Sequence, residues 1–225
     1  MFNPTKLRGI VKKIIKYGED VYQVFFETYR LIRFKPGQFL HLSLDEYDPC
    51  DGYWPESRVF SIASLPGVSE VEIVYSVKGE YTRRMSDELI EGREVWLKLP
   101  YGDFVIDNHV KYGEKTYMIA GGTGIAPFIS FLRSNISNCK YRLKLYYGIR
   151  DKNYYLYRDF LEDVKDKIDL RIIYGMMDVE EISDDIVKHG FGRCFISGPP
   201  LMIGNFRSKL VDKGFREEDI IIDEW

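Results

Sequence analysis

The sequence predicts two domains, an antiparallel β domain followed by a parallel α/β sheet. In the first half, short runs rich in Val, Ile, Phe and Tyr are mostly separated by Gly, Pro, Asp or Asn, which is typical of strands and turns. In the second half, apolar strands alternate with helical stretches over short links, which is typical of a parallel sheet covered on both faces. The pattern of predicted elements changes near residue 110, so we expect domains at 1–109 and 110–225.

The runs of the first half have the length and the β-branched or aromatic composition of strands. Six such strands in about 100 residues predict a small closed barrel or a sandwich. One helical stretch, residues 80–90, stands before the last strand. The expected strands are 7–15, 21–28, 38–44, 58–64, 70–77 and 94–100.

The second half repeats a strand, a short link and a helix. This order predicts a Rossmann-like parallel sheet with its ligand site beyond the carboxyl ends of the strands. The expected strands are 116–120, 141–149, 170–175, 193–198 and 219–223, and the expected helices are 124–136, 155–166, 180–190 and 199–214.

The composition excludes several classes of function. The net charge is −3 with acidic and basic residues well mixed, so a nucleic-acid partner is not expected. No apolar run approaches the roughly 18 residues that cross a bilayer, and the N-terminal residues lack the apolar core of a signal peptide, so we expect a cytoplasmic protein. Cys50, Cys139 and Cys194 are too few and too scattered for a disulfide framework or for an iron–sulfur cluster of the chain's own, and no metal site is expected.

The stretch AGGTGIAP, residues 120–127, links the first strand of the second half to a helix. Its glycines allow backbone N–H groups to approach a pyrophosphate, and the start of the helix favours an anion. A tight turn needed only for packing is the alternative. The pattern is neither GxGxxG nor a P-loop, which disfavours ATP or GTP chemistry.

Two further segments could bind phosphate. Arg58–Ser61, at a barrel strand, offers a guanidinium fork, an aromatic ring and a hydroxyl. Gly79 and Thr82 open the lone helix of the first half, where free N–H groups could hold a second anion. Taken separately, the first reads more simply as an ordinary strand with one exposed Arg and one core Phe, and the second could equally be a simple helix cap. Together with residues 120–127 they indicate one phosphate-bearing cofactor on each domain.

The order of the motifs resembles the ferredoxin–NADP reductase superfamily in its short form without an iron–sulfur domain. The resemblance covers nearly the whole chain and rests on FKPGQFLHLSL, RVFSIAS, KGEYTRRM, LPYGDF, AGGTGIAP, YYGIR, FISGPPLM and the terminal DEW. It implies a six-stranded antiparallel FAD-binding barrel followed by an NAD(P)-binding domain.

The resemblance implies a flavin site on the barrel. Arg58 would contact the FAD pyrophosphate, Phe60 would pack on the flavin, and Ser61 would lie near its N5 atom. The family often has Tyr in place of Phe60, so a hydroxyl contact to the ribityl chain is lost here. The implied flavin-binding residues are Arg58, Val59, Phe60, Ser61, Val74, Ser76, Gly79, Thr82 and Trp225.

The resemblance also implies a nicotinamide site on the second domain. Ser197 stands where many relatives have Cys, and a hydroxyl is less polarisable than a thiol. Trp225 would cover one flavin face and would have to move for the nicotinamide to enter. Ser61, Ser197 and Trp225 are therefore the expected catalytic residues. The expected nucleotide-binding residues are Gly121, Gly122, Thr123, Gly124, Arg150, Gly198 and Pro199.

The choice between NADH and NADPH depends on cations for the 2′-phosphate. Arg150 and Lys152 could supply them, whereas Asp178, Glu180 and Glu181 would repel a phosphate. We expect NADH, with NADPH as the alternative.

The expected function is an FAD-dependent NAD(P)H oxidoreductase that passes electrons to a separate ferredoxin, flavodoxin or iron–sulfur subunit. One alternative is a reductase of free flavin, although such enzymes tend to lack the second phosphate site. The other is a non-catalytic nucleotide-binding or docking subunit of a larger redox complex, which the intact motifs disfavour.

Overall fold

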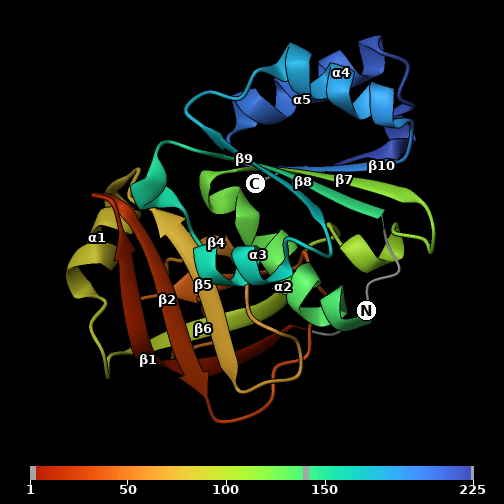
Figure 1. The fold of residues 1–225 in the computed structure, drawn as a ribbon. Coiled ribbons are helices and arrows are strands. Elements are labelled where there is room, and N and C mark those ends of the chain that lie inside the picture. Colours follow the sequence, from red (N-terminus) through yellow and green to blue (C-terminus); the bar gives the residue numbers. More distant parts are fainter. Residues whose placement is uncertain (1–3, 139–141, 224–225) are drawn as a thin grey trace.

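The computed structural model describes residues 4–138 and 142–223. Its two halves lie side by side, with the barrel below the α/β layers in the view of Figure 1. Helices α4 and α5 cover the outer face of the parallel sheet, and α2 and α3 lie between that sheet and the barrel (Figure 1). The expected fold class is confirmed.

The first half is a six-stranded antiparallel sheet with the order β4-β3-β6-β1-β2-β5. Its two edge strands, β4 and β5, meet where the backbone N–H of Ala63 donates to the carbonyl of Glu72 at 2.8 Å, so the sheet is a nearly closed barrel. Closure leaves little exposed strand edge. The elements are β1 (Thr5–Tyr17), β2 (Val21–Thr28), β3 (Phe39–Ser43), β4 (Arg58–Ser61), β5 (Glu70–Ser76), α1 (Glu80–Glu88) and β6 (Glu94–Tyr101).

The second half is a five-stranded parallel sheet with the order β11-β10-β7-β8-β9. From β7 the strand order runs through β8 to β9 on one side, and β10 and β11 lie on the other side of β7. The strand order therefore reverses between β7 and β10, and such a switch point is where open α/β sheets bind ligands. The elements are β7 (Lys115–Gly121), α2 (Ala126–Asn135), β8 (Arg142–Ile149), α3 (Arg158–Val164), β9 (Asp169–Tyr174), α4 (Val179–His189), β10 (Arg193–Ser197), α5 (Pro200–Asp212) and β11 (Ile220–Ile222).

Short 3₁₀ turns supplement these elements and shift some of the expected bounds. Gly122–Ile125 forms such a turn, so α2 begins at Ala126 rather than at residue 124. The strand expected over 58–64 ends at Ser61, because the chain then crosses from β3 toward β5. The other 3₁₀ turns are Ile106–Asn108, Ile136–Asn138, Lys152–Tyr154 and Glu217–Asp219.

The hydrophobic core has three parts. One fills the barrel and one lies between the sheet and α4 and α5. The third lies under α2 and α3 and takes in Val21, Ala63 and Val74 from the barrel half. Because residues of both halves contribute to this cluster, it does not mark where one domain ends. The domain boundary expected between residues 109 and 110 stays a prediction. In the described part of the chain, no helix is both long and apolar enough to cross a bilayer.

Candidate functional site

The glycine-rich loop after β7 packs directly on the loop after β10. A Cβ built on Gly124 would lie 2.4 Å from the carbonyl oxygen of Ser197, and one built on Gly198 would lie 3.0 Å from the backbone N of Gly121. Sequence reasoning left open whether these glycines serve packing or a ligand. At Gly124 packing alone requires glycine, and at Gly198 the tight contact and a φ of +153° both favour it.

Gly122 differs from its neighbours in the same loop. Its φ of +54° is a left-handed conformation that favours glycine, and a Cβ there would meet no atom within 4 Å. The residue is exposed at the switch point of the sheet. Its backbone can therefore be approached by a ligand, as a pyrophosphate site requires. Thr123 lies half-buried beside it.

Ser197 ends β10 under this loop and is buried. Its hydroxyl donates a hydrogen bond of 2.8 Å to the carboxylate of Asp223. Asp223, which follows β11, is also buried, and its backbone N–H donates to the carbonyl of Ile196. The Ser197 hydroxyl is thus held in one orientation by a residue that sequence reasoning did not identify. Pro199 follows as the residue before α5.

Arg58 stands at the start of the barrel edge strand β4 with its guanidinium half-exposed. The guanidinium carbon lies 4.7 Å from the ring centre of Tyr81, which belongs to α1. The Tyr81 hydroxyl donates to the carbonyl of Leu42 at 2.8 Å, and burial raises the pKa of Tyr81 to about 12, so the hydroxyl stays protonated. The structure therefore brings Arg58 next to α1, although Tyr81 lies 23 positions further along the chain.

The start of α1 provides N–H donors near that guanidinium. The Thr82 hydroxyl accepts hydrogen bonds from the backbone N–H groups of Lys78 and Gly79, at 2.9 and 3.1 Å. It is therefore engaged in the helix cap itself. The N–H groups of the first helical turn have no partner within the helix, and a Cβ on Gly79 would meet nothing within 4 Å. Arg58 and the first turn of α1 together suit an anion.

An acidic neighbour, which sequence reasoning missed, already binds the Arg58 guanidinium. The carboxylate of Glu56 accepts from it at 2.9 Å, and both side chains are about half exposed. Exposed pairs of this kind contribute about 1 kcal/mol or less. A doubly charged phosphate group could displace Glu56.

The remaining expected flavin residues lie on the two edge strands of the barrel. Phe60 is half-buried and packs edge-on against Tyr75, with ring centres 6.1 Å apart. Val74 is buried in the cluster that both halves share, whereas Val59, Ser61 and Ser76 are half-buried. The structure thus gathers these residues along β4 and β5, where the barrel closes. Trp225 lies outside the described residues.

Arg150 follows β8 at the carboxyl edge of the parallel sheet. Its guanidinium binds the carboxylate of Asp20, a barrel residue, through two hydrogen bonds of 2.9 and 2.7 Å. Sequence reasoning did not identify Asp20, because 130 residues separate the partners and no local pattern marks the pair.

The acidic residues after β9 have structural partners. Asp178 caps α4 by accepting from the backbone N–H of Glu181 at 3.0 Å. Glu181 pairs with Arg171. Glu180 pairs with Lys209 and Lys213, and these bonds lower the pKa of Glu180 to about 2. The repulsion of a 2′-phosphate expected from these three acids is therefore weaker than the sequence suggests.

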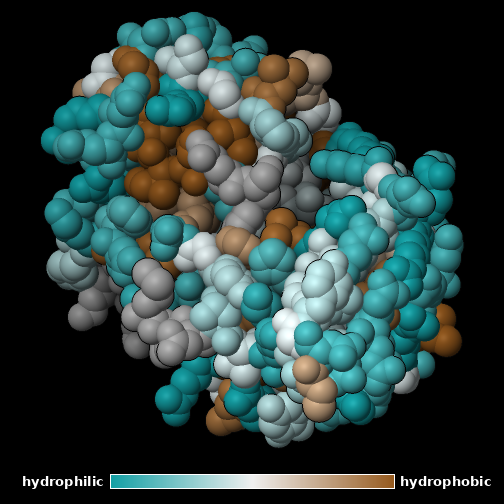
Figure 2. All heavy atoms as spheres, turned by 180° about the vertical axis from the view of Figure 1, so that it is seen from behind, coloured by the Kyte–Doolittle hydropathy of each residue, from teal (hydrophilic) through white to brown (hydrophobic). Residues whose placement is uncertain are grey.

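Apolar side chains accompany the glycine loops at this edge. Met176 and Leu201, which follow β9 and β10, are strongly exposed. From behind, hydrophobic atoms gather on the α/β half, while the barrel half is mainly hydrophilic (Figure 2). Exposed apolar side chains such as Met176 and Leu201 suit the flat rings of a nucleotide.

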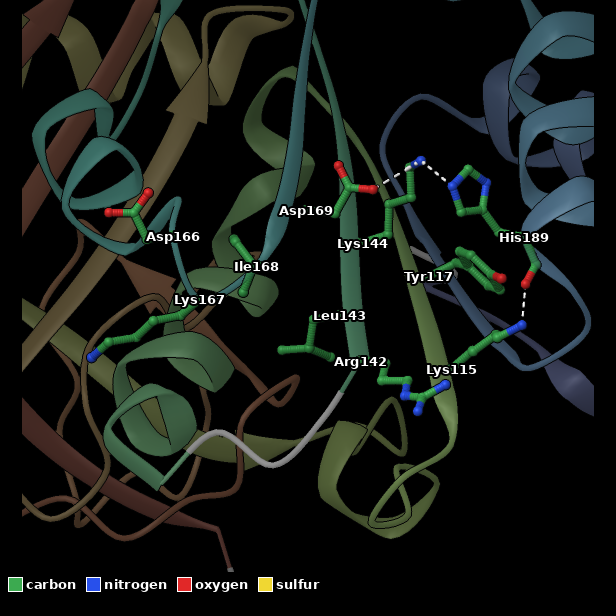
Figure 3. A pocket seen from close by; sticks show the side chains of 10 residues that line it. All are labelled: Lys115, Tyr117, Arg142, Leu143, Lys144, Asp166, Lys167, Ile168, Asp169 and His189. Atoms are coloured by element: carbon green, nitrogen blue, oxygen red, sulfur yellow. Dashed lines mark hydrogen bonds and ion pairs between the residues drawn. The ribbon is translucent and has the colours of Figure 1, made fainter.

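A surface hollow of about 490 Å³ lies at the opposite edge, near the amino ends of β7, β8 and β9. Figure 3 shows its side chains, with Lys144 between Asp169 and His189 and with Lys115 donating to the carbonyl of His189. These cations are engaged within the protein, and parallel sheets bind ligands at the other edge. We assign no function to this hollow.

Comparisons with known proteins agree with this arrangement. Residues 118–191 match the family model described as an oxidoreductase NAD-binding domain. The reductase component of propane 2-monooxygenase from Mycolicibacterium smegmatis is 30% identical over 194 residues, which cover 76% of this chain and 53% of that protein. A ferredoxin–NADP reductase from Pseudomonas aeruginosa is 34% identical over 138 residues, which cover 59% of this chain and 50% of the relative.

One solved structure shows the same fold over its whole length. A ferredoxin NADP⁺ reductase from Neisseria gonorrhoeae, with bound FAD and NADP, superposes with a TM-score of 0.79 at 17% identity and covers 99% of this chain and 98% of that one. The chain spans about half the length of the curated relatives named above. The expected cofactor pair, FAD with a nicotinamide nucleotide, agrees with these findings.

Proposed function

We propose that this chain, which belongs to the ferredoxin–NADP reductase superfamily, takes electrons from a nicotinamide nucleotide onto FAD and passes them to a separate electron carrier. One observation carries the proposal. The molecule has two places whose geometry suits a phosphate, Arg58 with the start of α1 on the barrel and the loop around Gly122 on the sheet. Two such sites fit two phosphate-bearing cofactors, one on each half.

The residues present fit these groups. Arg58 offers a half-exposed guanidinium whose only charged partner among the described residues is the weakly held Glu56, and Gly79 leaves open space above the first turn of α1. These would hold the FAD pyrophosphate, with Phe60 and Ser61 further along β4 toward the flavin ring. Gly122 and Thr123 would hold the pyrophosphate of the nicotinamide nucleotide.

FAD, when bound, supplies the redox chemistry, since a flavin can accept electrons in pairs and release them singly. The chain's own residues bind the two cofactors and orient them. Asp223 holds the Ser197 hydroxyl at 2.8 Å in a buried position, which fixes that hydroxyl beside Gly198. The packing of Gly124 against Ser197 keeps the two nucleotide-binding loops at a fixed separation.

The electron acceptor is proposed from chemistry and from the relatives. A ferredoxin, a flavodoxin or an iron–sulfur subunit would suit a chain whose sequence offers no cysteine set for a cluster of its own. One relative is a component of a monooxygenase system and another is a ferredoxin–NADP reductase. A cytoplasmic location remains an expectation from the sequence.

The test is an anaerobic spectral titration of the purified protein. We expect the protein to carry flavin absorption bands that bleach on addition of NADH at low concentration and of NADPH only at higher concentration. The first result would support the reductase, and the second would support the expected nucleotide preference.

Other outcomes would support the alternatives. A colourless protein that becomes active only with added free flavin would favour a flavin reductase. A protein that keeps its flavin bands unbleached by either nucleotide would favour a docking subunit.

Replacing Arg58 by alanine is expected to weaken FAD binding by a factor of about 10 to 100. A hydrogen-bonded charge contributes about 1.5–3 kcal/mol, and Arg58 is the cation that the structure places beside α1. Isothermal titration of the flavin-free variant with FAD measures the change.

Arg83→Ala is the matched control, since Arg83 is an exposed arginine of α1 and its loss removes the same charge. We expect a change of less than about threefold, because screened charges at a distance act weakly. Equal losses in the two variants would refute a specific role for Arg58. Glu56→Gln should raise FAD affinity slightly, since it removes the competing carboxylate.

A further inference from the structure

Arg150 is one of the two cations that the sequence offers for the 2′-phosphate of NADPH, yet the structure shows it engaged. Both terminal nitrogens bind the two carboxylate oxygens of Asp20, at 2.9 and 2.7 Å. This two-point geometry is the one that an arginine uses for a phosphate. A 2′-phosphate and Asp20 would therefore compete for the same guanidinium face.

The turn that carries Asp20 is firmly seated. The Tyr154 hydroxyl accepts hydrogen bonds from the backbone N–H of Glu19 and from Arg150, each at 3.2 Å. A Cβ on Gly18 would lie 2.3 Å from the Tyr154 ring, so the turn touches that ring directly. The guanidinium also lies over the ring, 4.5 Å from its centre. Asp20 is thus placed against Arg150 by contacts that do not depend on the ion pair.

The pair is nonetheless open to a ligand. The Arg150 side chain is 58% exposed and that of Asp20 is 28% exposed. The hydrogen bond to Arg150 lowers the pKa of Asp20, so the carboxylate is charged at neutral pH and would repel a phosphate dianion.

Few other cations could bind the 2′-phosphate in place of Arg150. In the segments directly after β8 and β9, residues 150–154 and 175–178 of the described chain, the basic side chains are Arg150 and Lys152. Lys152 offers a flexible point charge rather than a planar fork. Selection between the two nucleotides therefore depends mainly on whether Arg150 is available.

We propose that Asp20 is a specificity-determining residue, whose carboxylate occupies Arg150 and so makes the nucleotide site favour NADH over NADPH. The proposal rests on the function proposed above. It replaces the explanation from Asp178, Glu180 and Glu181, whose charges are engaged in the cap of α4 and in ion pairs.

The test compares 2′,5′-ADP with 5′-AMP, two nucleotides that differ only in the 2′-phosphate and that bind without turnover. Isothermal titration is performed on the full chain in the presence of FAD. In Asp20→Asn we expect 2′,5′-ADP to bind about tenfold more tightly, the effect of about one charge-assisted hydrogen bond. The affinity for 5′-AMP should change less than about twofold, because 5′-AMP lacks the phosphate that meets Arg150.

Glu19→Gln is the matched control. It removes the same charge one residue away in the same turn, and Glu19 contacts Tyr154 through its backbone N–H. We expect it to leave the ratio of the two affinities within about twofold, since an exposed charge that makes no direct contact is screened. The double variant Asp20→Asn with Arg150→Ala should lose the gain, because the freed guanidinium is then absent.

Three results would overturn the proposal: an unchanged ratio in Asp20→Asn, an equal change in Glu19→Gln, or a gain that persists without Arg150. Binding of neither nucleotide to any variant would overturn both this proposal and the proposed function. A different outcome would overturn the proposed function alone: 5′-AMP binds normally and the affinity ratio changes as expected, but no reduced nucleotide bleaches the flavin. Circular dichroism confirms that each variant is folded.

Discussion

Gly124→Ala is expected to destabilise the protein by about 3 kcal/mol, at the upper end of the cost of overpacking. The added Cβ would lie 2.4 Å from the carbonyl oxygen and 2.5 Å from the carbonyl carbon of Ser197. Both contacts are to backbone, so no side-chain rotation can relieve them. Because the loop after β10 must move, binding of 5′-AMP should weaken as well. Urea denaturation and isothermal titration measure the two effects.

Gly204→Ala provides the control. Gly204 lies inside α5, close in sequence to the same site, and a Cβ there would meet nothing within 4 Å. Alanine is the better helix former by about 1 kcal/mol, so this variant should be as stable as the parent or more stable. If Gly124→Ala behaved like Gly204→Ala, the close packing of the two loops would not be present in solution.

Arg133→Ala is expected to cost about 3 kcal/mol, since removing one partner of a buried ion pair leaves a charge without compensation. Arg133, on α2, pairs with Glu72 of the barrel strand β5, and it also donates to the carbonyl of Ala63 at 3.0 Å. The Glu72 side chain is only 2% exposed, and it also accepts a hydrogen bond from Gln23 at 2.6 Å. Urea denaturation followed by far-ultraviolet circular dichroism gives the free energy of unfolding.

Two further variants test the cause of the loss of stability in Arg133→Ala. Arg8→Ala removes the arginine of an exposed pair with Glu94 in the same barrel, and we expect a cost of about 1 kcal/mol or less. Adding Glu72→Gln to Arg133→Ala removes the buried charge and should recover a large part of the loss. A cost for Arg133→Ala no greater than that for Arg8→Ala would contradict the structural importance of this contact between the halves.

The sequence predicted the order and type of the elements well, because each carries a local signal. Short runs rich in Val, Ile and Tyr mark strands such as Glu70–Ser76, and the 3.6-residue period marks helices such as Val179–His189. The superfamily resemblance is confirmed as well. Its motifs are short contiguous stretches, which can be recognised without knowing where they lie in space.

The individual site residues are less well determined by sequence. The structure brings Arg58 to α1 and the loop around Gly122 to Gly198. It also supplies partners from distant segments, Asp20 for Arg150 and Asp223 for Ser197. Asp20 and Arg150 are 130 positions apart, so only the folded chain shows that they meet. The roles expected for Ser61, Ser197 and the other site residues stay predictions.

The sequence by itself predicted the fold class, the resemblance to the superfamily and the positions of the two candidate phosphate motifs, because periodicity and contiguous glycine-rich segments are local properties of the chain. Only the tertiary structure decided which charges are available to a ligand. Whether the guanidinium of Arg150 or the carboxylate of Glu180 faces a phosphate depends on partners brought from distant segments, Asp20 in one case and Lys213 in the other. Coulomb energies fall with distance through space, not with separation along the chain.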